Sequence, residues 1–127
     1  MARLPSRDLT ERELQIMHVF WRCGEITAQD VQDDLARNKL DLAYTTVATL
    51  VRILVDKGHL TITHEERPFR YRATQPYEKV SGRMLDNLIE QVFHGSRKQL
   101  VLRLMEDKPL PKKEQAALKK LLEDLEP

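Results

Sequence analysis

The segment that most constrains the fold is YTTVATLVRILVDK at residues 44–57. Placed on a helix, its apolar side chains cover an arc of roughly 200°, which is wider than the usual amphipathic stripe. A helix of this kind must pack against more than one neighbour. The remaining arc is narrow and carries small or polar side chains: Thr45, Ala48, Thr49, Arg52 and Asp56. The sequence therefore predicts a central helix that is buried on two sides and leaves one polar strip free.

Two shorter helices are predicted before the central helix. Thr10 and Glu13 have the spacing of a capping box, and apolar residues follow at mostly helical spacing until Gly24. Thr27 is placed to cap a second helix, which ends before a polar break at residues 38–41. These two helices supply the neighbours that the wide apolar arc requires on one side.

A β-hairpin is predicted to cover the other side. After the central helix, residues 60–63 and 69–72 alternate apolar and polar side chains, and a polar connection separates them. The second strand would place two aromatic side chains on one face and two arginines on the other, namely Phe69 and Tyr71 opposite Arg70 and Arg72. Because an isolated hairpin is marginal in water, the aromatic face is expected to lie on the helices.

The chain is expected to form two domains. Residues 1–73 make one predicted unit with its own core, and residues 74–127 make a second unit of three helices. Helices this short and few rarely bury enough surface to fold alone. A second copy of the chain in a two-fold dimer would cover the surplus apolar side chains. The predicted dimerisation residues are Val80, Met84, Leu88, Val92, Leu104, Leu118, Leu121 and Leu125.

Charge distinguishes the middle of the chain from its ends. The formal net charge is only +1, but residues 37–72 carry seven basic side chains against four acidic ones. A local basic excess favours a polyanionic partner such as nucleic acid. A duplex major groove, about 12 Å wide, admits one helix, and threonine side chains can contact base edges. Hairpin arginines would then contact the flanking phosphates. A module that binds protein instead of DNA is the alternative interpretation of the same pattern.

Composition and motifs argue against catalysis, metal binding and membrane insertion. The sequence has no nucleophile-base pattern, and its four glycines match no phosphate-binding loop. The four histidines are scattered, and a lone cysteine, Cys23, excludes an internal disulfide and a Cys-based zinc site. Cys23 is predicted to be a small buried residue. No apolar run approaches the roughly 20 residues of a membrane span. We therefore expect a cytoplasmic protein that is not an enzyme and needs no metal or cofactor.

Four segments of the chain form an ordered set: LTERELQIMHVFW, ITAQDVQDDL, LAYTTVATLVRILVDKGHL and FRYRAT. This set resembles the BlaI/MecI family of penicillinase-type repressors, and the similarity extends over essentially the whole chain. The resemblance implies a mainly α fold: a winged helix-turn-helix domain of three helices plus a β-hairpin wing, followed by a three-helix dimerisation domain. It also implies a dimeric transcriptional repressor, whose partners are palindromic double-stranded operator DNA and a second copy of itself.

The resemblance further implies roles for particular residues. Residues at the family's recognition-helix and wing positions are expected to bind DNA here as well, and the hairpin pattern adds Arg72 to them. The predicted DNA-binding residues are Tyr44, Thr45, Thr46, Thr49, Arg52, Arg67, Arg70 and Arg72. Family members often have Ser where this chain has Ala43, so the helix cap is expected to be weaker by ~1 kcal/mol.

A signal is expected to release the repressor from DNA, and proteolysis in the tail is one candidate for that signal. In the best-known members of the family, a sensor-linked protease cuts the fifth helix between Asn and Phe. The corresponding positions here are Arg103 and Leu104, which therefore mark the candidate cleavage region. Because both residues differ from the family pattern, the sequence leaves open whether a protease of different specificity or another signal releases the DNA.

Overall fold

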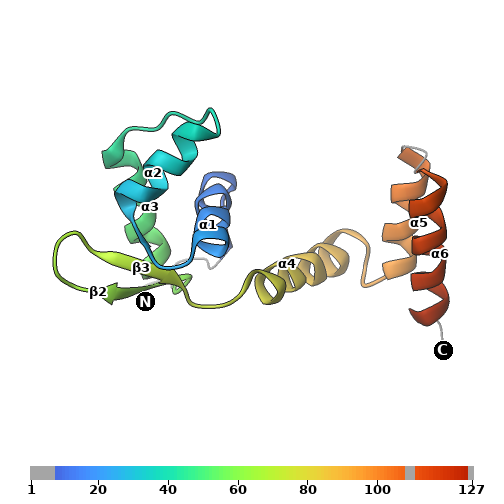
Figure 1. The fold of residues 1–127 in the computed structure, drawn as a ribbon. Coiled ribbons are helices and arrows are strands. Elements are labelled where there is room, and N and C mark those ends of the chain that lie inside the picture. Colours follow the sequence, from blue (N-terminus) through green and yellow to red (C-terminus); the bar gives the residue numbers. More distant parts are fainter. Residues whose placement is uncertain (1–7, 108–110, 126–127) are drawn as a thin grey trace, which may run out of the picture. The chain divides into compact units, whose positions relative to one another are not determined.

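The computed structural model describes residues 8–107 and 111–125. The chain divides into two compact units, Met1–Lys79 and Val80–Pro127. Six helices and three strands follow one another along the described chain (Figure 1). They are α1 (Glu11–Cys23), β1 (Ile26–Thr27), α2 (Ala28–Arg37), α3 (Tyr44–Asp56), β2 (Leu60–His64), β3 (Arg70–Ala73), α4 (Tyr77–Val92), α5 (Arg97–Asp107) and α6 (Lys112–Leu125).

Side-chain caps start the first two helices where the sequence predicts them. The Thr10 hydroxyl accepts a hydrogen bond from the Glu13 amide at 3.1 Å, and Glu13 Oε1 accepts one from the Thr10 amide at 2.8 Å. Thr27 and Asp30 make the same reciprocal pair at the start of α2, with both bonds at 3.1 Å. The two predicted N-caps are thus confirmed. Each cap satisfies amides that a helix start leaves without an intrahelical partner.

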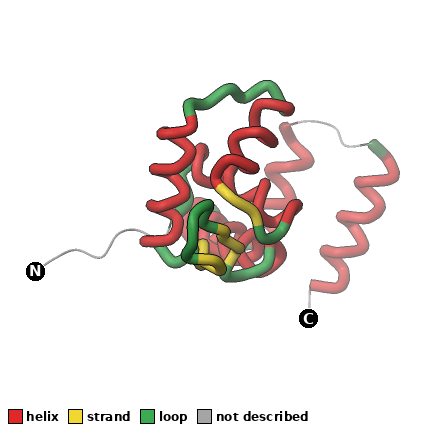
Figure 2. The backbone as a smooth tube through the Cα atoms, turned by 60° about the vertical axis from the view of Figure 1, so that its left-hand side comes forward, coloured by secondary structure: helices red, strands yellow, loops and turns green. Residues whose placement is uncertain are grey.

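The core of the first unit surrounds α3. Val47, Val51 and Leu54 are fully buried on this helix. They pack with apolar side chains of α1, α2 and β2, among them Ile16, Met17, Val19, Phe20, Val31, Leu35 and Leu60. The prediction that this helix packs on both sides is therefore confirmed. Figure 2 shows the backbone with its strands in yellow and its helices in red.

The sheet of the first unit has three antiparallel strands in the order β1-β3-β2. The hairpin of β2 and β3 is the predicted wing, but its second strand begins at Arg70 rather than at Phe69. Tyr71 is half-buried, and its ring meets Phe20 edge-on with centroids 6.5 Å apart. Phe69 is 38% exposed, so the expectation that it lies on the helices is wrong, because it precedes the strand. The short strand β1 had no counterpart in the sequence analysis.

The second unit consists of most of α4 together with α5 and α6, and α5 contacts α6. The Ser96 hydroxyl accepts a hydrogen bond from the Gln99 amide at 3.1 Å, which caps the start of α5. Ile89 is buried, but many apolar side chains of the unit are not. None of the described helices combines the length and the apolar character that a membrane span requires.

Cys23 corrects one expectation of the sequence analysis. Its side chain is exposed rather than buried, because it lies in the last turn of α1 at the edge of the core. Its thiol lies 3.8 Å from the carboxylate of Asp34, which is itself buried. Asp34 accepts two hydrogen bonds from Arg22, at 2.8 and 3.1 Å, and these bonds tie α2 to α1.

Candidate nucleic-acid interface

The exposed strip of α3 carries the predicted polar side chains. Thr45, Thr49, Arg52 and Asp56 are exposed, and they share one face because they are spaced by three or four residues. Ala48 beside them is half-buried. The opposite face is fully buried in the core, so α3 cannot turn this strip away from a partner without disrupting its packing. The strip is a rigid, slim surface with hydroxyl groups near its amino end and a guanidinium two turns further along.

The amino end of α3 is open. Tyr44 is 48% exposed, and Thr46 is exposed beside it. The N-cap residue, Ala43, provides no side-chain hydrogen bond to the first turn, as expected from its lack of a polar side chain. The first-turn amides of such a helix are available to an external acceptor, and the helix dipole favours an anion there.

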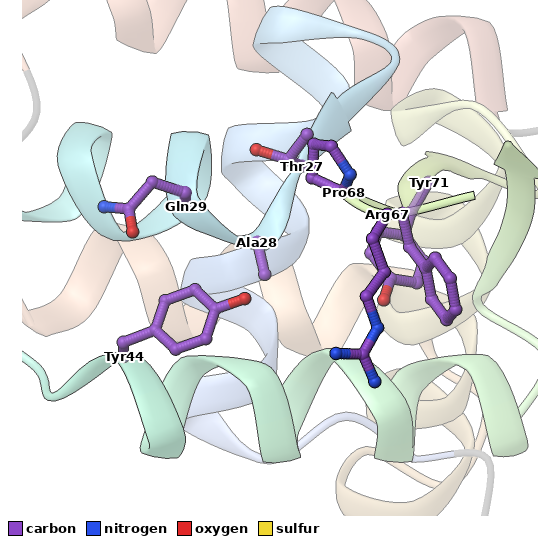
Figure 3. A pocket seen from close by; sticks show the side chains of 8 residues that line it. Thr27, Ala28, Gln29, Tyr44, Arg67, Pro68 and Tyr71 are labelled. Atoms are coloured by element: carbon purple, nitrogen blue, oxygen red, sulfur yellow. The ribbon is translucent and has the colours of Figure 1, made fainter. Parts of the chain in front are cut away.

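A groove of about 610 Å³ lies next to this helix end. Three parts of the first unit line it: the start of α2, Tyr44 on α3, and the loop between β2 and β3 with the adjoining strand. The lining residues are Thr27, Ala28, Gln29, Tyr44, Arg67, Pro68, Phe69 and Tyr71. Figure 3 shows the side chains of Tyr44 and Arg67 reaching from opposite sides into the space between α2 and α3.

The sequence does not predict the part of the groove that α2 provides. Thr27 marks the start of a helix in the sequence, but nothing in the sequence shows that this start lies beside the wing. The pairing of β1 with β3 sets Thr27 opposite Arg70 and so brings the start of α2 next to the wing. A strand of only two residues is too short to show the alternation of apolar and polar side chains by which strands are recognised in a sequence.

The arginines of α3 and of the wing have charges that the fold does not neutralise. Arg52, Arg67, Arg70 and Arg72 are all exposed. In the part of the chain that the structure describes, the ion pairs involve other cations, namely Arg22, Arg37 and Lys57. Among the described residues, these four guanidinium groups have no carboxylate partner in an ion pair. Such groups suit a polyanion, since the arginine fork matches phosphate geometry.

Two phenol groups, those of Tyr44 and Tyr71, line the groove. Burial raises the pKa of Tyr71 above its ordinary value of 10.0, and the neighbouring Tyr44 adds to this increase. The Tyr71 hydroxyl therefore stays protonated near neutral pH. A neutral hydroxyl can donate a hydrogen bond to an anionic oxygen, and it carries no negative charge that would repel an anion from the groove.

The predicted dimerisation residues fall into three groups. Exposed apolar side chains are Met84, Leu88, Val92, Leu104 and Leu121. Val80 is 5% exposed within a single chain, so little of its surface remains for a partner, and Leu118 is half-buried. The side chain of Leu125 lies outside the described residues. Arg103 and Leu104, the candidate cleavage region, are both exposed on α5.

The order of elements in the first unit, a helix, a short strand, two helices and a hairpin, is that of a winged helix-turn-helix domain. The second helix of the pair, α3, carries the exposed strip, which is the place of the recognition helix in such domains. The fold and the site together define the class of winged-helix regulators.

Within that class, the chain belongs to the penicillinase repressor family, whose family model matches residues 9–124. The transcriptional regulator BlaI of Mycobacterium tuberculosis is 30% identical over 127 residues, which cover 99% of this chain and 89% of that protein. The methicillin resistance regulatory protein MecI of Staphylococcus aureus is 23% identical over 115 residues, which cover 91% and 93%. A solution structure of the DNA-binding domain of the repressor BlaI covers 61% of this chain and 90% of that domain, with 26% identity and a TM-score of 0.49.

Proposed function

We propose that this chain is a transcriptional repressor that binds palindromic operator DNA as a homodimer, through α3 and the wing. The observation that carries this proposal is the exposed strip Thr45, Thr49 and Arg52 on a helix whose opposite face is buried. A helix in a major groove needs small side chains near its contact and a few polar groups that reach base edges. The family, whose relatives are transcriptional regulators, supports the same function.

In this proposal the groove beside α3 receives the sugar-phosphate backbone of one DNA strand. Tyr44 and Arg67 reach into it from two sides, and their contacts would position the protein without reading sequence. Arg70 and Arg72 of the wing would contact phosphates further along. Arg52 lies on the strip itself and would contact a base.

Homodimerisation is proposed to occur through the second unit. Met84, Leu88 and Val92 lie four residues apart on α4, and each is at least 39% exposed in the single chain. Neighbouring exposed apolar side chains at this spacing are typical of a surface that another helix covers. A two-fold dimer would present two copies of α3 to two half-sites, which explains a palindromic operator.

Release from DNA is proposed to act through the same unit. Cutting the chain between Arg103 and Leu104 would remove α6 and part of α5 from the dimer. Each domain would then have to bind its half-site alone, and the gain in affinity from linking two binding sites would be lost. Both residues are helical, so a protease would have to unwind α5 locally to reach the peptide bond.

A gel-shift titration with duplex DNA from the region upstream of the chain's own gene tests the proposal. Retardation is expected at about 50 mM salt and should decrease steeply as salt is raised, because phosphate contacts release counterions. A scrambled duplex of the same length and composition is the control and should bind more weakly. Absence of retardation of either duplex at any salt concentration would contradict DNA binding and favour a protein-binding adaptor.

A further inference from the structure

A buried ion pair joins the end of α3 to the start of α1. Lys57, the residue that follows α3, donates a hydrogen bond from Nζ to Glu13 Oε1 at 2.7 Å. The same ammonium group donates to the backbone carbonyl of Asp8 at 3.1 Å. The side chains of Lys57 and Glu13 are only 13% and 3% exposed. The pair lies outside the groove and off the exposed strip of α3.

The Glu13 carboxylate has two roles at once. Its Oε1 atom accepts the hydrogen bond from Lys57 and also the bond from the Thr10 amide at 2.8 Å that completes the cap of α1. Burial acts against ionisation of this carboxyl group. The hydrogen bonds from Lys57 and then from Thr10 outweigh burial, so the pKa of Glu13 lies below its ordinary value of 4.5. Glu13 is therefore anionic near neutral pH and holds the Lys57 ammonium in a fixed direction.

Stability alone does not account for this pair. Burying two charges is costly, and well-packed apolar residues of similar volume often stabilise a fold as well or better. Val47, Val51 and Leu54 already hold α3 in the core, but apolar packing is non-directional and forms no bond with a fixed geometry. Hydrogen bonds to a fixed carboxylate are directional, so they restrict the last turn of α3 in a way that apolar packing does not.

We propose that Glu13 and Lys57 are positioning residues for DNA recognition: their hydrogen-bonded pair fixes the last turns of α3 and thereby the placement of Arg52. Arg52 lies five residues before Lys57, on the exposed strip. This inference rests on the proposed function of α3 as the helix that reads DNA. A base contact tolerates little misplacement, so loss of the pair should weaken recognition more than it weakens the fold.

The decisive variant is the double substitution Glu13→Gln with Lys57→Met. Glutamine keeps the cap of α1, and methionine keeps most of the volume of the lysine stem, so both charges disappear while the packing stays. We expect a thermal unfolding temperature close to that of the wild type. We expect binding to the upstream duplex to weaken about tenfold or more, the size of effect expected when a base-reading arginine is displaced.

Asp34→Asn provides the matched control. Asp34 is buried and forms an ion pair with the exposed Arg22 at 2.8 Å, but this pair joins α1 to α2 and does not involve the end of α3. This variant should unfold at a lower temperature. Below that temperature it should bind the duplex as tightly as the wild type, since the last turn of α3 keeps its partner.

Amide hydrogen exchange in the free protein gives a second readout that needs no DNA. Exchange in the last turn of α3 should become faster in the double variant and stay unchanged in Asp34→Asn. The inference is overturned if the double variant binds the duplex as tightly as the wild type, or if its last turn exchanges no faster. If the wild type itself binds no duplex, the proposed function fails, and the placement of Arg52 for DNA fails with it.

Discussion

The indole Nε1 of Trp21 donates a hydrogen bond of 3.1 Å to the backbone carbonyl of Gln75, 54 residues further along the chain. The ring of Tyr77 meets Trp21 edge-on with centroids 5.3 Å apart, and the ring of His18 meets Trp21 edge-on with centroids 5.4 Å apart. All four residues belong to the first unit. The contact fixes the segment that leads into α4 onto α1, and so it defines where the winged-helix unit ends.

Trp21→Phe should lower the free energy of unfolding by about 1 kcal/mol, because it removes this hydrogen bond and reduces the packing of the ring. Trp21 is the only tryptophan in the sequence, so urea unfolding should be followed by circular dichroism rather than by fluorescence. His18→Gln is a suitable control, since it changes a ring contact and keeps the bond to Gln75. Equal midpoints for Trp21→Phe and the wild type would show that the bond contributes nothing.

Tyr44→Phe should weaken duplex binding by about 1 kcal/mol, on both the upstream and the scrambled duplex, because it removes one hydroxyl from the groove that is proposed to hold the DNA backbone. The matched control is Tyr77→Phe, since Tyr77 is similarly exposed at 46% and lies outside the groove lining. Fluorescence anisotropy with labelled duplex measures both variants. Equal losses in the two variants would argue against a backbone contact in the groove.

Glu13 should make the stability of the fold depend on acid pH. Its pKa is lower in the folded state, so the ionised carboxylate stabilises the fold above the ordinary pKa of 4.5, and this stabilisation is lost as the pH falls through the folded value. The free energy of unfolding of the wild type should therefore decrease more steeply than that of Glu13→Gln from about pH 5 downward. Urea titrations at a series of pH values measure both curves. Glu11→Gln, an exposed change in the same helical turn, is the control, and parallel curves for Glu13→Gln and the wild type would contradict the assignment.

Leu88→Lys should convert the proposed dimer into a monomer, because two lysines would meet in an apolar interface where each charge is costly to bury. Leu88 is 43% exposed in the single chain, so the substitution is expected to leave the core of the unit itself in place. Sedimentation velocity measures the association state. Gln91→Lys introduces the same charge at an exposed polar position of α4 and should leave the dimer intact. A dimeric Leu88→Lys variant would place the interface elsewhere.

Features with local sequence signals could be predicted from the sequence. Thr10 and Thr27 were identified as caps because a capping box spans only four residues. The burial of Val47, Val51 and Leu54 follows from the helical period of one short segment. These parts of the fold need no knowledge of which distant residues meet.

Features that depend on distant contacts were not predicted. Glu13 could be recognised as a cap residue, but its partner Lys57 lies 44 positions away and carries no local mark of that role. Likewise, the groove exists because β1 pairs with β3, and β1 is too short to show an alternating pattern. Cys23 was expected inside because cysteine is often buried, whereas its place at the end of α1 leaves it exposed.

The central claim is that the exposed strip of α3 reads the sequence of a DNA duplex, and Arg52→Ala tests it most directly. The measurement is the ratio of affinities for the upstream duplex and a scrambled duplex. We predict that Arg52→Ala weakens binding to the upstream duplex by about 1–3 kcal/mol and lowers this ratio, whereas Arg70→Ala weakens both duplexes alike and reduces the salt slope by about one. A ratio in Arg52→Ala equal to that of the wild type would contradict the claim.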